Sequence, residues 1–247
     1  MVLVTRCSQE VVVVDKASKR FGNVIAVSEL SFRVCSGEIF CIVGPNGAGK
    51  TTTLRMIVGL LKPDSGSVRV LGYESYDLPL QVKKRIAYVP EEAGVVKGLT
   101  GLEYLEFIAE VYGAGAEAVE KGVTLTGLGD AVRKRVEEYS KGMKRRLLVA
   151  ASLAVEPTLL VLDEPTAGLD VSHALFVRNA IADYVKSRDA TAIISSHNML
   201  EVEYLCDRVA LINRGVIVEE GSPKEIIAKH RVRNLEEAFV KITGGSM

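Results

Sequence analysis

The sequence predicts an α/β fold with a β-rich opening, a helical block in the middle and a return to alternating strands and helices. Short runs of β-branched and other aliphatic residues, separated by turn signals, dominate residues 1–90. Helical periodicity replaces them over 91–155, and the alternation resumes after Pro157. A chain of 247 residues that is 48% hydrophobic and 25% charged can bury a sizeable core, as one large domain or two close subdomains.

The charge balance argues against a nucleic-acid partner. Lys and Arg together number 31, as do Asp and Glu, so the formal net charge is zero. A protein that neutralises a phosphate backbone carries clustered excess cations. We therefore expect no nucleic acid among the partners.

The cysteines and the hydropathy indicate a reduced chain that does not cross a membrane. Cys7, Cys35, Cys41 and Cys206 show neither CxxC spacing nor a metal-ligand cluster, so a reduced, intracellular chain is the simplest interpretation. No stretch approaches about 18 uninterrupted apolar residues, and the N-terminus lacks the pattern of a signal peptide.

The opening contains three expected strands before the first helix. They cover 11–14, 30–34 and 39–43, with a basic turn at 16–20. A helix is then expected over 52–61, a strand over 68–71, a helical piece over 80–85 and a strand over 86–89 that Pro90 closes.

The middle block contains three expected helices. Thr100 and Glu103 form a capping box, which predicts a helix that begins at Gly101 and ends at Gly113. The others are expected over about 130–138 and over 141–155. This block looks like an inserted helical subdomain covering 91–155.

The last third returns to strands and helices. Strands are expected over 159–162 and 191–195 with a helix over 172–187 between them, and a hairpin over 209–218 turns at Asn213-Arg214-Gly215. Two short helices are expected from Pro223 and from Asn234. We therefore assign 1–90 and 156–222 to the α/β core with its β subdomain, and 223–247 to a helical tail.

A glycine-rich stretch between the strand at 39–43 and the following helix predicts a phosphate-binding loop. It fits GxxxxGK followed by Thr, in which glycines let the backbone N–H groups point at phosphate oxygens. Lys50 would reach the β- and γ-phosphates, and the Thr51 hydroxyl would ligate Mg²⁺. The alternative is a plain glycine-rich turn. The stretch is Gly44, Pro45, Asn46, Gly47, Ala48, Gly49, Lys50 and Thr51.

Two carboxylates end the apolar run at 159–162. Asp163 fits a residue that holds Mg²⁺ through its waters, and Glu164 would sit beside the γ-phosphate and polarise the attacking water. An apolar run followed by Asp-Glu is also common at structural strand ends. The presence of a phosphate loop in the same chain favours the catalytic interpretation.

With these motifs, the chain resembles the ATP-binding cassette (ABC) family over nearly its whole length. Tyr139-Ser140-Lys141-Gly142-Met143 resembles the LSGGQ signature of that family, with Lys141 in place of a glycine and Met143 in place of the glutamine. Cations crowd this helix start, which favours a bound phosphate, the alternative being a solvated basic face. The cations are Lys141, Lys144, Arg145 and Arg146.

The resemblance implies a head-to-tail dimer with two ATP molecules between phosphate loops and signatures. Asp170 looks like the D-loop residue that couples the two sites, and His197 looks like the switch histidine that contacts the γ-phosphate. Phe21 looks like the aromatic residue that stacks on adenine. The alternatives are a bystander histidine and a core phenylalanine. Thr52, Ser140, Lys141 and Gly142 complete the implied nucleotide contacts.

Glu91 departs from the family pattern, which usually has Gln at this position. A carboxylate keeps the oxygen ligand but loses the amide donor and adds negative charge. Our hypothesis is that Glu91 still ligates the metal when nucleotide is bound. This Glu and the run Ser140-Lys-Gly-Met-Lys-Arg-Arg are similar to exporter-type ATPase subunits.

The resemblance implies a RecA-like P-loop NTPase core with an antiparallel β subdomain and an inserted helical subdomain. It also implies ATP hydrolysis with Mg²⁺, integral membrane permease subunits as partners, and a cytoplasmic location at the inner face of the membrane. Two rivals are a soluble ABC ATPase acting in assembly, such as iron–sulfur cluster formation, and a repair or chromosome-maintenance head. The second should carry a long coiled coil between Thr51 and Ser140, where the sequence has none. A plain P-loop kinase or GTPase would not need Ser140, Asp170 and His197 together.

Overall fold

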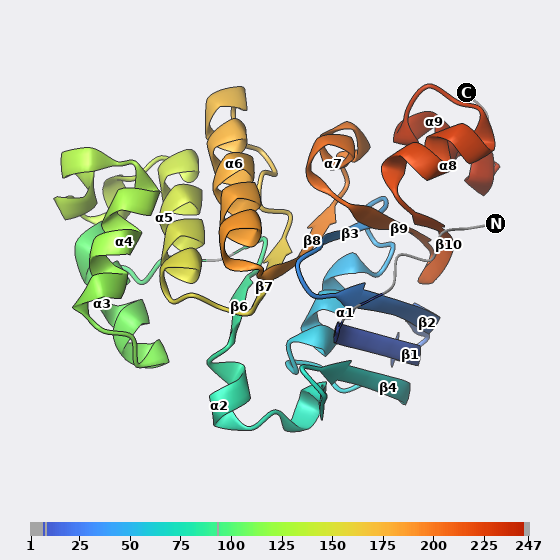
Figure 1. The fold of residues 1–247 in the computed structure, drawn as a ribbon, viewed down its shortest axis with the longest axis horizontal. Coiled ribbons are helices and arrows are strands. Elements are labelled where there is room, and N and C mark those ends of the chain that lie inside the picture. The colour runs from blue at the N-terminus through green and yellow to red at the C-terminus, as the bar shows by residue number, and fades with distance from the viewer. Residues whose placement is uncertain (1–6, 8, 93, 245–247) are drawn as a thin grey trace.

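The predicted α/β class is confirmed by the computed structural model, which describes residues 7, 9–92 and 94–244 (Figure 1). Strands form an antiparallel sheet of order β2-β1-β4-β5 and a six-stranded sheet of order β10-β9-β3-β8-β7-β6. In the larger sheet β9, β3, β8, β7 and β6 run parallel, and β10 is an antiparallel edge strand. The parallel strands thus bring several carboxyl ends to one edge, where ligands bind in such sheets.

Every predicted strand is present, and β3, β6 and the β9/β10 turn lie at the predicted residues. Strands β1 and β2 are longer than predicted, and β5 was not predicted. The bounds are β1 Glu10–Phe21, β2 Val24–Cys35, β3 Ile39–Val43, β4 Ser65–Val70, β5 Tyr73–Glu74, β6 Ile86–Val89, β7 Leu159–Asp163, β8 Thr191–Ser196, β9 Arg208–Asn213 and β10 Val216–Gly221.

The helices gather beside the sheets, with α3, α4, α5 and α6 together on one side (Figure 1). Within the described ranges, they lack the combination of span and hydrophobicity that a bilayer crossing requires. Their bounds are α1 Lys50–Ile57, α2 Leu80–Lys83, α3 Gly101–Tyr112, α4 Ala116–Thr126, α5 Lys141–Ala154, α6 Val171–Arg188, α7 Met199–Leu205, α8 Pro223–His230 and α9 Leu235–Thr243.

Strand β3 is buried on both faces, which is why its sequence is a continuous apolar run. Ile39, Cys41 and Val43 enter one hydrophobic core, and Phe40 and Ile42 enter the other. The phosphate loop therefore follows directly from the most enclosed strand of the sheet.

Two predicted elements are wrong. The basic turn at 16–20 is part of β1, whose pairing with β2 shifts register several times over these residues, so a strand with bulges accommodates the polar run. The expected helix over 130–138 is two 3₁₀ turns, because Val136 N donates to Leu99 O and Gly101 N donates to Lys134 O. Tertiary backbone pairing outweighs helix propensity here.

The predicted capping box at the start of α3 is confirmed. Helices α4 and α7 were not predicted. Thr100 Oγ1 accepts from Glu103 N at 3.2 Å, and Glu103 Oε2 accepts from Thr100 N at 2.7 Å. Asn198 caps α7 by accepting from Glu201 N at 3.1 Å.

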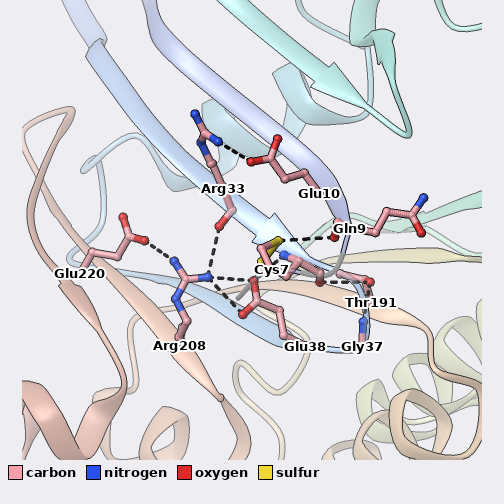
Figure 2. Close-up of a disulfide and its surroundings, with 10 residues drawn as sticks. Cys7, Gln9, Glu10, Arg33, Gly37, Glu38, Thr191, Arg208 and Glu220 are labelled. Atoms are coloured by element: carbon pink, nitrogen blue, oxygen red, sulfur yellow. Dashed lines mark hydrogen bonds and ion pairs between the residues drawn. A yellow bond between two sulfur atoms is a disulfide. The ribbon is translucent and has the colours of Figure 1, made fainter. Parts of the chain in front are cut away.

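The prediction of reduced cysteines is wrong, because the structure contains two disulfides. Cys7 pairs with Cys35 at the end of β2 (Figure 2), and Cys41 of β3 pairs with Cys206 after α7. The paired Cα atoms lie 5.5 and 6.1 Å apart. Sequence separations of 28 and 165 residues hid both pairs from any test based on local spacing.

Candidate functional site

The loop between β3 and α1 has the backbone geometry of a phosphate cradle. Gly47 and Gly49 have φ of 78° and 105°, in the left-handed region that favours glycine. A Cβ at Gly49 would lie 2.4 Å from Ala26 O, and one at Gly44 would lie 2.2 Å from Ile212 O. Gly215 N, in the β9/β10 turn, donates to Ala48 O at 3.0 Å. The loop is thus supported by two hairpins from opposite ends of the chain.

Lys50 is the first residue of α1, and its ammonium group lies inside the loop. The side chain is 6% exposed, and Nζ donates to Gly44 O at 2.8 Å. The same Nζ lies 3.2 Å from Glu164 Oε1. Lys50 therefore connects the loop to the acids at the end of β7.

Asp163 and Glu164 are buried side by side and are organised by β8. Ser195 Oγ donates to Asp163 Oδ1 at 2.5 Å and accepts from Glu164 N at 3.0 Å. His197 Nδ1 lies 2.8 Å from Glu164 Oε2. Glu164 itself has a φ of 48°, which is uncommon outside glycine and turns the chain sharply after the strand. Its carboxylate is thereby held between Lys50 and His197.

The oxygen atoms left over at these acids suit a hydrated cation. Asp163 Oδ2 and Glu164 Oε1 are buried and accept no hydrogen bond from the residues that the structure describes, although Lys50 is close to the latter. Mg²⁺ prefers carboxylate and hydroxyl oxygens and keeps several waters. Those same residues contain no cluster of three His, Cys, Asp or Glu side chains that could hold a metal. An ion here would need a phosphate ligand in addition to the protein.

Glu91 follows β6 and Pro90 with an exposed side chain, and its backbone is held by α5. Arg145 Nη2 donates to Glu91 O at 2.6 Å, and Nη1 donates to Pro90 O at 3.1 Å. Burial lowers the pKa of the Arg145 guanidinium, against the opposing charges of Glu91, Asp163 and Glu164. The expectation that Arg145 and Arg146 crowd a phosphate is wrong, because both bind backbone carbonyls inside the molecule.

Ser140 is the exposed N-cap of α5, and its Oγ accepts from Met143 N at 3.2 Å. Gly142 is buried against the His173 ring, so that a Cβ there would lie 2.4 Å from His173 Cδ2. Lys141 is exposed and its Nζ would lie 2.3 Å from a Cβ at Gly168. Helix α5 lies beside α4 and α6, away from α1 (Figure 1). The signature-like start of α5 is thus a separate surface from the phosphate loop of the same chain.

Asp170 and Phe21 both lie at the surface. Asp170 caps α6 by accepting from His173 N at 3.0 Å, and this bond and those from Ser172 and His173 lower the pKa of its carboxyl. Phe21 ends β1 and is 51% exposed, so the alternative of a core phenylalanine is wrong.

The structure therefore brings Lys50, Asp163, Glu164 and His197 together, whereas the hydrogen bonds and ion pairs of the described residues do not connect Ser140, Asp170 or Phe21 to them. Sequence reasoning assigned no role to Ser195, and it placed Arg145 beside a phosphate instead of in the interior. The signal for Ser195 was a buried strand that ends in two hydroxyl residues just before His197. The signal for Arg145 was its position three residues after Gly142 and three before Leu148, on the buried face of α5.

Known proteins resemble this chain in sequence and in fold. Residues 27–167 match the family model described as "ABC transporter". The chain is 40% identical over 215 residues to the daunorubicin/doxorubicin resistance ATP-binding protein DrrA of Streptomyces peucetius, covering 84% of this chain and 64% of that protein. It is 33% identical to the ABC transporter ATP-binding protein NatA of Bacillus subtilis, with 97% of each chain covered.

A solved structure described as the ATP-binding subunit of an ABC transporter superposes with a TM-score of 0.85 at 27% identity, covering 94% of this chain and 99% of that one. A nucleotide-free ATP-binding cassette superposes with a TM-score of 0.80 at 25% identity, covering 95% and 99%. The predicted P-loop NTPase fold is thus confirmed. With a family model matched over more than half of its length and a relative aligned almost end to end, the chain belongs to the ABC transporter family as an ATP-binding domain.

Proposed function

We propose that this chain binds and hydrolyses ATP with Mg²⁺, as one of two ATP-binding subunits that drive export through separate membrane subunits. The observation that carries the proposal is the buried pair Asp163 and Glu164: Glu164 lies between Lys50 and His197, and one oxygen of each carboxylate accepts no hydrogen bond from the described residues. Such an arrangement in a family of ATP-binding proteins fits in-line attack of water on a γ-phosphate.

Each residue of the cluster has a separate task in this proposal. Lys50 and the loop N–H groups stabilise charge on the phosphates, and Glu164 accepts a proton from the attacking water. Thr51 and Asp163 would hold Mg²⁺, which neutralises phosphate charge when bound. Because Lys50 pairs with Glu164 in the structure, phosphates that attract Lys50 also release the Glu164 carboxylate for water. His197 would sense the γ-phosphate.

The remaining contacts surround the nucleotide. The backbone of 44–51 and the side chains of Thr51 and Thr52 lie at the phosphate end, at the positive end of α1. Phe21 would stack on adenine, which its exposure permits. Glu91 would add an oxygen ligand to the metal.

Two copies are needed to complete each site in this proposal. Within one chain α5 begins away from α1 (Figure 1). Ser140, Lys141 and Gly142 would therefore meet a triphosphate only on a second copy, where the free N–H groups of the α5 start suit an anion. Asp170, next to this surface through His173 and Gly142, would couple the two sites.

The names of relatives favour transport as the output. They include a bacitracin transport ATP-binding protein of Bacillus licheniformis and a Nod factor export ATP-binding protein of Rhizobium etli. The chain spans 64% of the length of DrrA, so export and the membrane subunits are proposed here by analogy. The proposed location is cytoplasmic, at the inner face of the membrane, by analogy with the same transporter subunits.

We further propose three functional parts: a core with its β subdomain over 1–90 and 156–222, a helical subdomain over 91–155 that passes motion to the membrane partner, and a tail over 223–247. A chromosome-maintenance head is disfavoured, because the longest helix described between Thr51 and Ser140 has 12 residues. The transporter names of the relatives favour transport over a role in assembly.

The test is Glu164→Gln, with Glu117→Gln on the exposed face of α4 as the matched control. Glu164→Gln should retain ATP binding, measured by calorimetry, while the hydrolysis rate falls by roughly 10² or more through loss of a general base. It should also accumulate an ATP-dependent dimer in analytical ultracentrifugation, which Ser140→Ala in the same background should weaken. Full turnover in Glu164→Gln would remove Glu164 from the mechanism, and a strictly monomeric ATP complex would remove the two-copy site.

A further inference from the structure

Arg145 is a buried cation whose guanidinium binds only backbone carbonyls in the described part of the chain. It is 5% exposed and lies in the second turn of α5, the helix that Ser140 caps. Its two terminal nitrogens donate to Pro90 O at 3.1 Å and to Glu91 O at 2.6 Å. Burying an arginine costs free energy unless its donors are satisfied, so this fork fixes the segment after β6 against α5.

The neighbouring Arg146 also donates to two backbone carbonyls, but these lie at the end of α4. Its Nε donates to Thr126 O at 2.8 Å and its Nη2 donates to Gly127 O at 2.7 Å, at the end of α4. Its guanidinium also lies 3.8 Å from the ring centroid of Phe176. Two adjacent arginines thus each bind a pair of carbonyls, but only Arg145 connects α5 to the segment that carries Glu91.

We propose that Arg145 is a positioning residue that transmits the placement of the Pro90–Glu91 backbone to the α5 start at Ser140. The inference rests on the proposed function, in which Glu91 faces one nucleotide and Ser140 another. A shift of Glu91 toward a metal ion moves the two carbonyls, and the planar, bidentate guanidinium carries α5 with them. As a consequence, nucleotide bound at the phosphate loop of one copy changes the position of Ser140 of that copy, which would contact the nucleotide of the second copy.

The first measurement is amide hydrogen exchange of the full chain without nucleotide. Arg145→Gln should raise exchange in the peptide covering 86–92 by tenfold or more, whereas Arg146→Gln should leave that peptide unchanged and raise exchange around 126–128 instead. Equal exchange at 86–92 in Arg145→Gln and the wild-type protein would overturn the proposal.

The second measurement adds MgATP. In the wild-type protein it should slow exchange at both 44–51 and 140–147; in Arg145→Gln the change at 44–51 should persist and the change at 140–147 should be lost. Persistence of both changes would overturn the proposal. If MgATP protects neither region in the wild-type protein, the proposed function fails, while the nucleotide-free measurement still decides whether Arg145 holds the segment.

Steady-state ATP hydrolysis separates positioning from general stability. Arg145→Gln should lower kcat by tenfold or more with KM for ATP within threefold, and Arg146→Gln should keep kcat within twofold even where its melting temperature falls equally. Equal losses of kcat in the two variants would show that Arg145 contributes only to stability and would overturn the proposal. If Arg145→Gln does not fold, Arg145→Lys replaces it, because lysine keeps the positive charge but cannot donate to both carbonyls as a planar guanidinium does. Full activity of Arg145→Lys would overturn the argument that the bidentate contact is needed.

Discussion

Removing the Cys41–Cys206 disulfide, whose two residues lie in the hydrophobic core, should lower the stability of the protein more than removing the Cys7–Cys35 disulfide. The bond closes a loop of 165 residues between the strand before the phosphate loop and the end of α7. In the loop-entropy model, closing such a loop destabilises the unfolded chain by about 5 kcal/mol, against about 3.5 kcal/mol for the 28-residue separation of Cys7 and Cys35. For a chain of this size, Cys206→Ala should therefore lower Tm by roughly 10–20 °C.

Scanning calorimetry of the oxidised wild-type protein, Cys206→Ala and Cys7→Ala tests this reasoning. The expected order of Tm is wild type above Cys7→Ala above Cys206→Ala, and a reductant should bring the wild-type protein below both. Non-reducing peptide mapping after alkylation in denaturant provides an independent check. Recovery of Cys41 and Cys206 as alkylated thiols would refute the pairing. A Tm of Cys206→Ala close to that of the wild type would refute the predicted loss of stability.

Two further predictions concern the nucleotide. Glu91→Ala should raise the Mg²⁺ concentration needed for half-maximal ATP hydrolysis and lower the rate, whereas the control Glu92→Ala should change neither. Both quantities are measured by titrating Mg²⁺ into protein from which metal has been removed by a chelator. Identical titration curves for Glu91→Ala and the wild-type protein would show that Glu91 is not a metal ligand. Phe21→Ala should weaken ATP binding by roughly three- to tenfold through loss of stacking, and Phe21→Tyr should preserve it. Calorimetric titration is the assay, and equal affinity in the alanine variant would place adenine elsewhere.

The parts of the fold that the sequence predicted well are those with strong local signals. The apolar run of β3, the capping box of α3 and the Asn213-Arg214-Gly215 turn each specify their structure within a few residues. Helix α4 lacks such a signal, because Gly115 provides no side-chain cap and Gly122 lies within the helix. A Cβ at Gly122 would lie 2.7 Å from Leu105 Cδ2, so close packing on α3 selects the glycine that weakens the helical pattern.

The candidate site divides in the same way. Sequence motifs predicted Lys50, Asp163 and Glu164, the family resemblance added His197, and the structure brings those four side chains together. The motifs could not reveal that Lys50 pairs with Glu164, since the two are brought close only by the sheet order. Arg145 was hidden for a different reason, because a basic run on a helix normally indicates a solvated face, and only its partners show that this member is buried.

The order of strands in the larger sheet limits how the chain can be divided. Strand β3 lies between β8 and β9, and both of these come from residues after 190. A fragment limited to the 27–167 segment would leave β3 and β7 without the strand that joins them, and would lose the Gly215 amide that supports Ala48. The shortest piece able to fold with an intact phosphate loop must therefore extend from the first hairpin through β10, so the recognisable motif is much smaller than the unit that folds.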